Sequence, residues 1–420
     1  MPPSRAGKGG GGSSGGGKGG SKAPLVAGAA VLAALLAGVF VPIGPAWRGP
    51  PPERAPLLNA TACTIERLDE AAWEACFVDE FYLKKPAILK WDSSEALAAL
   101  RARTERQVLM RDHGRVTVNV DRFRNLWQPG SSKTAALSEY VESIPPASGE
   151  YLFDTGEFLK ETGLDRDWRT APGLVQTGHY RDSSDPAGRS RRGGFAEAPA
   201  VGQPVTGIIT IALGGDKQGI PFHWHGDAYS VQLHGAKLWV IFAPGQMPSS
   251  GFLLSETLEQ WLEGRQHQRV DENLAIPSAY QCVQKPGELL YVPEGFYHAT
   301  SCIGDAVAIT QHSVDNVHGS AYDLYHNASD LLTEWLDLAK RKFHTRPATK
   351  QKLTDAASLL ERALKLDSTN SEILLKLEFV AEARGDTRTA IAILRRALKV
   401  NPLCIKSHST LIRMLEKLGA

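Results

Sequence analysis

Two histidines separated by one residue, His223 and His225, precede a long apolar stretch of the chain. In an extended segment, residues i and i+2 project from the same face, so one strand can present both imidazoles to one ion. A third histidine, His298, follows a second apolar stretch and a Pro-x-Gly turn, which would return a distant ligand to the first two. Imidazole suits iron, zinc, copper or nickel, and three protein ligands leave coordination positions open for chemistry. The pattern predicts a metal centre formed by these three histidines; the alternative is a buried polar cluster.

Three motifs around the histidines resemble the JmjC domain of the cupin superfamily. They read Phe222-His-x-His225, Gly235-x-Lys-x-Trp239 and Gly287-Glu-x6-Gly-x2-His298. Stretches near both ends of the same region resemble a small luminal branch of the family, so the predicted JmjC domain spans residues 63–312. The resemblance implies an α+β fold, a double-stranded β-helix of the jelly-roll type with flanking helices. Many short strands separated by Gly and Pro fit the same kind of barrel.

JmjC enzymes are Fe(II)- and 2-oxoglutarate-dependent oxygenases, and the resemblance implies that chemistry and those cofactors. His223 and His298 match the family's two histidine ligands. Lys237 matches the basic residue that pairs with the distal carboxylate of 2-oxoglutarate; the alternative is an exposed lysine on a strand. A set of three protein ligands leaves three positions on the iron, two for the keto acid and one for O2.

The chain departs from the family pattern at two positions. Most JmjC enzymes carry Asp or Glu where this chain has His225, so the ligands here would be three neutral imidazoles. Asp227 is the alternative carboxylate ligand, because it follows His225 with the same i, i+2 spacing. We prefer the histidine pair, since the residues just before His223 match the family's approach to its first ligand. Ile220 stands where several hydroxylases of the family have a threonine that helps to bind 2-oxoglutarate.

The N-terminal part of the chain predicts a tail, a membrane anchor and a stem. Residues 1–22 are mostly Gly, Ser, Lys and Arg without any acid, which predicts a disordered tail. Residues 23–43 are uncharged and just long enough to cross a bilayer as a helix, and residues 44–62 are proline-rich. Because basic residues precede the apolar segment and the first acid, Glu53, follows it, we expect a cytosolic N-terminus and a luminal body. A cleaved signal peptide or an organellar presequence is the alternative.

Two further features predict a single-pass type II membrane protein whose body lies in the endoplasmic reticulum or elsewhere in the secretory pathway. Asn59 and Asn327 each begin an N-glycosylation sequon. The five cysteines show no zinc-site spacing. Cys63 and Cys282 occupy positions that resemble those of the family's luminal branch, which implies a disulfide between them in an oxidising lumen.

The C-terminal part of the chain contains a short internal repeat. After a helical connector at 313–350, the segment 351–420 repeats with a period of 34 residues, which relates Ala363 to Ala397. That period resembles tetratricopeptide (TPR) repeats, paired helices that usually hold peptides or other proteins. About two repeats are fewer than a free-standing solenoid needs, so we expect them to pack on the barrel or on another subunit. The alternative is a helical cap that only covers apolar surface.

Composition narrows the functional classes. The 420 residues are 42% hydrophobic and 22% charged, which is enough to bury a sizeable core, and the formal charge is +1. No basic stripe interleaved with aromatic residues supports binding of nucleic acid. Two hypotheses stand: a luminal oxygenase that hydroxylates a protein or peptide side chain, and a JmjC pseudoenzyme that acts as a membrane-held adaptor through its helical repeats. A thiol-type dioxygenase that needs iron but no 2-oxoglutarate is a third.

Overall fold

The computed structural model describes residues 46–55, 63–91, 95–122, 132–143, 150–154, 157–168, 171–172, 208–246, 257–264, 279–313, 319–343, 346–401, 405–417 and 419. All of them belong to one compact unit that comprises Pro45–Ala420. The predicted tail at 1–22 and the predicted anchor at 23–43 lie outside the described residues. Within the described ranges, every helix is too short or too polar to cross a membrane.

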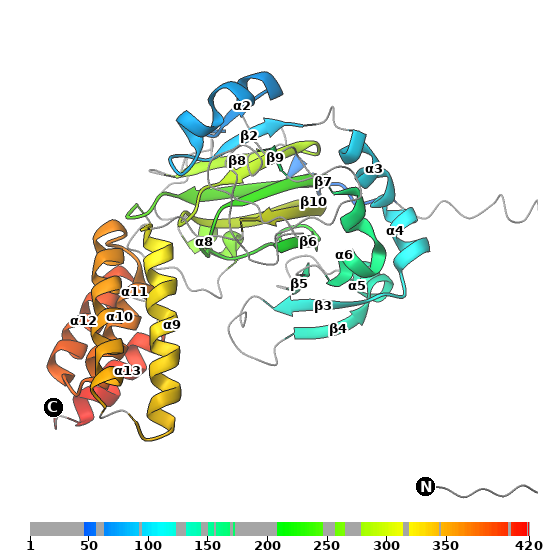
Figure 1. The fold of residues 1–420 in the computed structure, drawn as a ribbon. Coiled ribbons are helices and arrows are strands. Elements are labelled where there is room, and N and C mark those ends of the chain that lie inside the picture. Colours follow the sequence, from blue (N-terminus) through cyan, green and yellow to red (C-terminus); the bar gives the residue numbers. More distant parts are fainter. Residues whose placement is uncertain are drawn as a thin grey trace, which may run out of the picture. The chain divides into compact units, whose positions relative to one another are not determined.

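The described chain alternates helices and strands in its first two thirds and is helical thereafter (Figure 1). The strands are β1 (Glu66–Leu68), β2 (Ala87–Lys90), β3 (Thr117–Arg122), β4 (Ser132–Ala136), β5 (Glu150–Asp154), β6 (Ile208–Gly214), β7 (Ala228–Phe242), β8 (Tyr280–Gln284), β9 (Glu288–Val292) and β10 (Tyr297–His312). The helices are α2 (Glu70–Cys76), α3 (Glu95–Arg103), α4 (Arg106–His113), α5 (Leu137–Ser143), α6 (Glu157–Thr162), α8 (Leu258–Gly264), α9 (Ala321–Lys340), α10 (Pro347–Leu366), α11 (Ser371–Ala383), α12 (Thr387–Val400) and α13 (Ile405–Lys417). A π-helical turn at Phe77–Phe81 extends α2, and a 3-10 turn at Leu164–Asp167 follows α6.

The described strands form one mixed ten-stranded sheet in the order β1-β2-β9-β7-β10-β6-β5-β3-β4, and β8 also pairs with β7. Strand β7 therefore lies at the centre, with β8, β9 and β10 as antiparallel partners. Its residues are buried on both faces, and they include polar side chains such as Gln232 and Lys237 as well as the apolar run at 238–242. A large mixed sheet with flanking helices is consistent with the predicted cupin jelly roll.

Glycines bend the two longest strands where they pair. Gly235 interrupts β7 with a positive φ of 64°, and Gly304 interrupts β10 with a φ of 72°. The pairing register between the two strands shifts in this region, between Ile303 and Val307. A Cβ on Gly235 would lie 2.0 Å from the carbonyl oxygen of Asp305, so both the conformation and the space require glycine. This bulge lets a strand of 16 residues run from the candidate site to the far side of the sheet.

The predicted disulfide between Cys63 and Cys282 is confirmed. It joins the segment before β1 to β8 across 219 residues of sequence. Next to it, Thr64 donates its backbone N–H to the carbonyl of Gln281. The bridge thus fastens the start of the domain to the strand that pairs with β7.

Replacing both bridging cysteines with serine will lower the free energy of unfolding by about 2–5 kcal/mol, because the bridge closes a long loop and restricts the unfolded chain. Urea unfolding of the two proteins without reductant measures the difference. Cys76, a partly exposed free cysteine of α2, provides the matched control as Cys76→Ser. An unchanged midpoint in the double variant would show that the bridge does not stabilise the fold.

The described part of the predicted stem, residues 46–55, packs against the sheet. The Arg48 guanidinium pairs with Asp305 at 2.9 Å. Arg54 is only 5% exposed and pairs with Glu259 of α8 at 2.8 Å. This segment therefore belongs to the folded unit.

The five C-terminal helices, α9 to α13, pack consecutively against one another (Figure 1). Helices α9 to α12 share a hydrophobic core with the sheet, whereas Met414 of α13 packs in a separate cluster with α11 and α12. Pro347 begins α10, and the side chain of Asn370 caps α11 by accepting from the backbone N–H groups of Glu372 and Ile373. Residues 34 positions apart have the same environment: Ala363 and Ala397 are fully buried, and Gly385 and Gly419 both have positive φ. The packing of these helices on the sheet agrees with one of the two arrangements expected for so short a repeat, and a helical cap would pack in the same way.

Candidate metal centre

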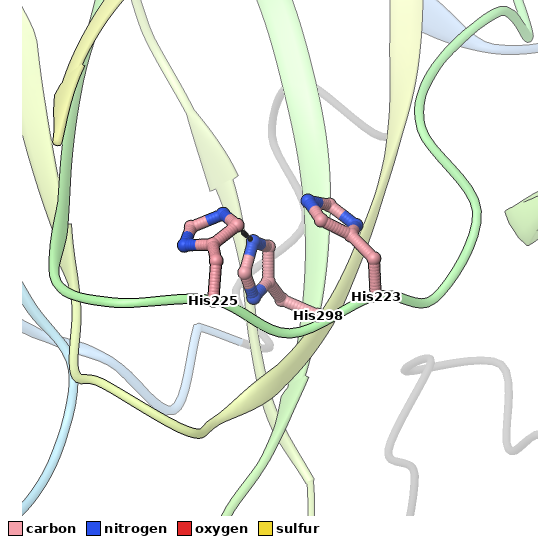
Figure 2. A group of neighbouring side chains, drawn as sticks. All are labelled: His223, His225 and His298. Atoms are coloured by element: carbon pink, nitrogen blue, oxygen red, sulfur yellow. Dashed lines mark hydrogen bonds between the residues drawn. The ribbon is translucent and has the colours of Figure 1, made fainter. Parts of the chain in front are cut away.

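The three predicted histidines lie together on two neighbouring chain segments (Figure 2). His223 and His225 lie on the extended segment before β7, and His298 is the second residue of β10. His223 and His298 form an isolated antiparallel bridge, with backbone N–H···O distances of 3.1 and 2.9 Å. Residues paired in this way project to the same face, so the bridge aligns the first and third imidazoles. The ligand nitrogens of all three lie within 4.8 Å of one another.

Each imidazole is oriented by its own backbone. The Nδ1 atoms of His223, His225 and His298 lie 2.8, 2.7 and 2.9 Å from the carbonyl oxygens of Pro221, Gly226 and Phe296, respectively. A carbonyl only accepts, so each Nδ1 carries the hydrogen and each Nε2 of a neutral ring presents a lone pair.

These lone pairs converge. The Nε2 atoms of His225 and His298 lie 3.1 Å apart, as the dashed line in Figure 2 shows. Two acceptors at that distance repel each other unless a cation lies between them. The donor set therefore fits a divalent transition metal held by three Nε2 atoms.

The protonation of the imidazoles agrees with this role. Burial, together with the nearby His225, lowers the pKa of His223 to about 3. Burial also lowers the pKa of His225 and, together with its two neighbours, that of His298. Neutral imidazole is the form that binds a metal, so protons do not compete for these nitrogens near pH 7.

Asp227, the alternative ligand, points away from the three histidines. Its carboxylate accepts hydrogen bonds of 2.9 Å from the Tyr291 hydroxyl and the backbone N–H of Glu294. Burial raises its pKa to about 6. The chain turns at Gly226 before β7 begins. His225 and Asp227 therefore do not project to the same face, although they are two residues apart. In this arrangement Asp227 fixes the turn that precedes His298.

Lys237 is buried, so the alternative of an exposed strand lysine is wrong; its side chain is 3% exposed. In the register of the two strands, Lys237 of β7 lies opposite Cys302 of β10, and Trp239 lies opposite Thr300. Because residues alternate along a strand, Lys237, Thr300 and Cys302 share the face that carries His298.

Among the described residues, no carboxylate forms an ion pair with Lys237. Its Nζ lies 5.7 Å from the ring centroid of Tyr151. Burial lowers the pKa of this ammonium group. Burial also raises the pKa of the neighbouring Cys302 thiol to about 11, so the thiol supplies no counter-charge near pH 7.

Two residues of the site were not predicted. His312, the last residue of β10, places its ring 4.7 Å from that of His225, so a fourth imidazole adjoins the three. Thr300 supplies a hydroxyl on the face of His298, and this hydroxyl accepts from the backbone N–H of Ile220 at 3.0 Å. Ile220 lacks the hydroxyl of the family's threonine, but the Thr300 hydroxyl lies next to it. The sequence signal for both residues was their even spacing from His298 along one strand.

A mixed β-sheet with three converging imidazoles defines a cupin-type metal-binding fold, and comparison with known families agrees. The JmjC domain family matches residues 204–320, which contain all three histidines and Lys237. The chain belongs to the family of JmjC domain-containing proteins.

Its relatives include JmjC domain-containing protein 8 of three mammals, Homo sapiens, Rattus norvegicus and Mus musculus. The protein from Mus musculus is 30% identical over 266 residues, covering 61% of this chain and 84% of the relative. The protein from Homo sapiens is 27% identical over 265 residues, covering 59% of this chain and 83% of the relative. A substantial part of this chain therefore has no counterpart in the matched region of these relatives.

Proposed function

We propose that the chain is an Fe(II)- and 2-oxoglutarate-dependent oxygenase that hydroxylates a protein or peptide side chain. The observation that carries the proposal is the combination of three Nε2 atoms around one point with a buried lysine on the same sheet face that forms no ion pair with any described residue. A buried ammonium group without a counter-ion costs several kcal/mol, and an anionic ligand relieves that cost. The distal carboxylate of 2-oxoglutarate is such a ligand.

In this proposal His223, His225 and His298 hold the iron, and Lys237 holds the co-substrate. Bound Fe(II) would supply the site for O2 activation, with 2-oxoglutarate as the source of electrons. The Thr300 hydroxyl, between His298 and Cys302 on the same face, is available to orient the co-substrate. The carbonyls of Pro221, Gly226 and Phe296 keep the three imidazoles in the ligating tautomer.

A second candidate function is that of an adaptor, a JmjC pseudoenzyme that presents its helical segment to a protein or peptide. Two observations favour it. His225 is an imidazole at the position where most of the family has a carboxylate. A groove of about 610 Å³ runs between α9, α11 and α13, and both apolar residues such as Leu332 and Phe379 and charged residues such as Lys376 line it. In both proposals the segment 23–43 anchors the chain, and the body lies in the lumen of the secretory pathway.

Turnover of 2-oxoglutarate separates the two functions. The full-length chain, purified in detergent, is loaded with Fe(II) under argon and then exposed to O2 with 2-oxoglutarate, and succinate is measured. Succinate formed in an iron-dependent manner supports the oxygenase. Bound iron without succinate favours the adaptor, whereas O2 uptake with thiols but without 2-oxoglutarate favours the thiol-type dioxygenase.

A further inference from the structure

The residue between the first two histidines, Trp224, lies on the opposite face of the chain from them. Its ring is stacked on that of Tyr297 at 5.8 Å, and Tyr297 is the residue just before His298. Both rings thus flank the backbone bridge that aligns His223 with His298. The Trp224–Tyr297 pair therefore covers the two ligand-bearing segments on the face opposite the histidines.

Helices of the C-terminal segment enclose Trp224. Tyr322 and Tyr325 of α9 place their rings 5.2 and 5.1 Å from the Trp224 ring, and Trp224 is only 9% exposed. A buried indole N–H needs an acceptor, because leaving it unsatisfied costs about 1–3 kcal/mol. That acceptor is a carboxylate oxygen of Glu372, in the first turn of α11, at 3.2 Å.

The Glu372 carboxylate is itself held in place. The same oxygen accepts the hydroxyl of Tyr325 at 3.3 Å, and the backbone N–H of Glu372 donates to the capping side chain of Asn370. Just before it, Asp367 accepts the backbone N–H of Gly245, which follows β7, at 2.9 Å. The turn between α10 and α11 is therefore fastened at two points, to Gly245 through Asp367 and to Trp224 through Glu372.

We propose that Glu372 is a positioning residue of the metal centre: by holding the Trp224 indole N–H, it sets the direction in which His223 and His225 project. The inference rests on the proposed function, since it requires that the histidines bind a metal. Side chains alternate along an extended segment, so a rotation of Trp224 turns both neighbouring imidazoles. The helical segment, which follows the JmjC domain in sequence, would then help to orient the metal ligands.

The test measures metal affinity and ligand geometry with Co(II) as the probe, on the full-length chain. Glu372→Ala should weaken Co(II) binding by about tenfold, which is the lower end of the range for loss of a group that orients a metal ligand. It should also change the visible absorption bands of bound Co(II). Glu372→Gln keeps an oxygen acceptor and should stay within about twofold of the unmodified chain. Trp224→Phe keeps an aromatic ring but removes the N–H donor, so it should reproduce the effect of Glu372→Ala. In the double variant Trp224→Phe/Glu372→Ala, the two effects should not add.

Glu382→Ala is the matched control, because it removes a glutamate of the same helix that pairs with Arg413 and not with Trp224. A role confined to folding would lower the unfolding temperature in Glu372→Ala and leave the Co(II) spectrum of the folded fraction unchanged, which would overturn the inference. Equal affinities in Glu372→Ala, Trp224→Phe and the unmodified chain would overturn it as well, while the metal centre itself stands. If the unmodified chain binds no Co(II) or Fe(II), the proposed function fails first.

Discussion

His298→Ala will abolish specific binding of Fe(II) and, with it, turnover of 2-oxoglutarate. The substitution removes one of the three converging Nε2 atoms and leaves His223 and His225 on one strand as a bidentate pair. Changes in groups that merely orient a ligand cost about 10–100-fold in metal affinity, so we expect a loss of more than about 100-fold here. Anaerobic titration with Fe(II) measures the affinity directly.

Thermal unfolding gives an independent measurement of the same loss. A metal that binds only the folded chain stabilises it by about 2.7 kcal/mol when its concentration is a hundred times Kd. The unmodified chain should therefore unfold at a higher temperature with Fe(II) than without, and His298→Ala should show no such shift. His408→Ala, which removes an exposed imidazole from α13, is the matched control and should behave like the unmodified chain. A normal metal-dependent shift in His298→Ala would show that the three histidines do not form the metal site.

Before metal is added, His298→Ala should cost the fold little. The Nε2 atoms of His225 and His298 face each other at 3.1 Å, so removing one of them relieves a repulsion between lone pairs. A cavity penalty works in the opposite direction, because His298 is buried. Similar unfolding temperatures of the two apo proteins would agree with this balance.

The convergence of the histidines was predictable because it depends on two local rules. Alternation along an extended chain puts His223 and His225 on one face, and the turn before His298 returns the chain to them. The central strand was predictable from the apolar run at 238–242, whereas the burial of its polar residues, such as Gln232, was not. The disulfide followed from the resemblance to the family's luminal branch, because pairing of cysteines is not readable from spacing alone.

Contacts that depend on tertiary packing were not predictable in this way. The direction of the Asp227 carboxylate is decided by Tyr291 and the turn at Glu294, more than sixty residues away. Trp224 and Glu372 are 148 residues apart, and no periodic pattern relates them. His312 reaches His225 only because β10 runs as one strand from Tyr297 through its bulge to His312.

Lys237→Met will weaken binding of 2-oxoglutarate by about 30-fold or more while leaving Fe(II) binding intact. Methionine is close to lysine in volume and removes only the ammonium group, whose burial is otherwise uncompensated by any carboxylate in the described part of the chain. Truncating one partner of a buried, hydrogen-bonded charge pair costs about 2–5 kcal/mol, which is about 30-fold or more in affinity. Titration of the Fe(II)-loaded chain with 2-oxoglutarate, followed by its metal-to-ligand absorption band, measures this effect.

The stability of the unliganded chain distinguishes a binding role of Lys237 from a structural one. If the ammonium group exists to bind an anion, its removal eliminates a desolvation cost, and Lys237→Met should unfold at the same temperature as the unmodified chain or at a higher one. If Lys237 served packing alone, the variant would keep its affinity for 2-oxoglutarate. Lys217→Met is the matched control, because this lysine lies in the turn between β6 and the histidine segment and is partly exposed. Unchanged co-substrate affinity in Lys237→Met would exclude it as the carboxylate ligand, and the three-imidazole site would then have to act without 2-oxoglutarate.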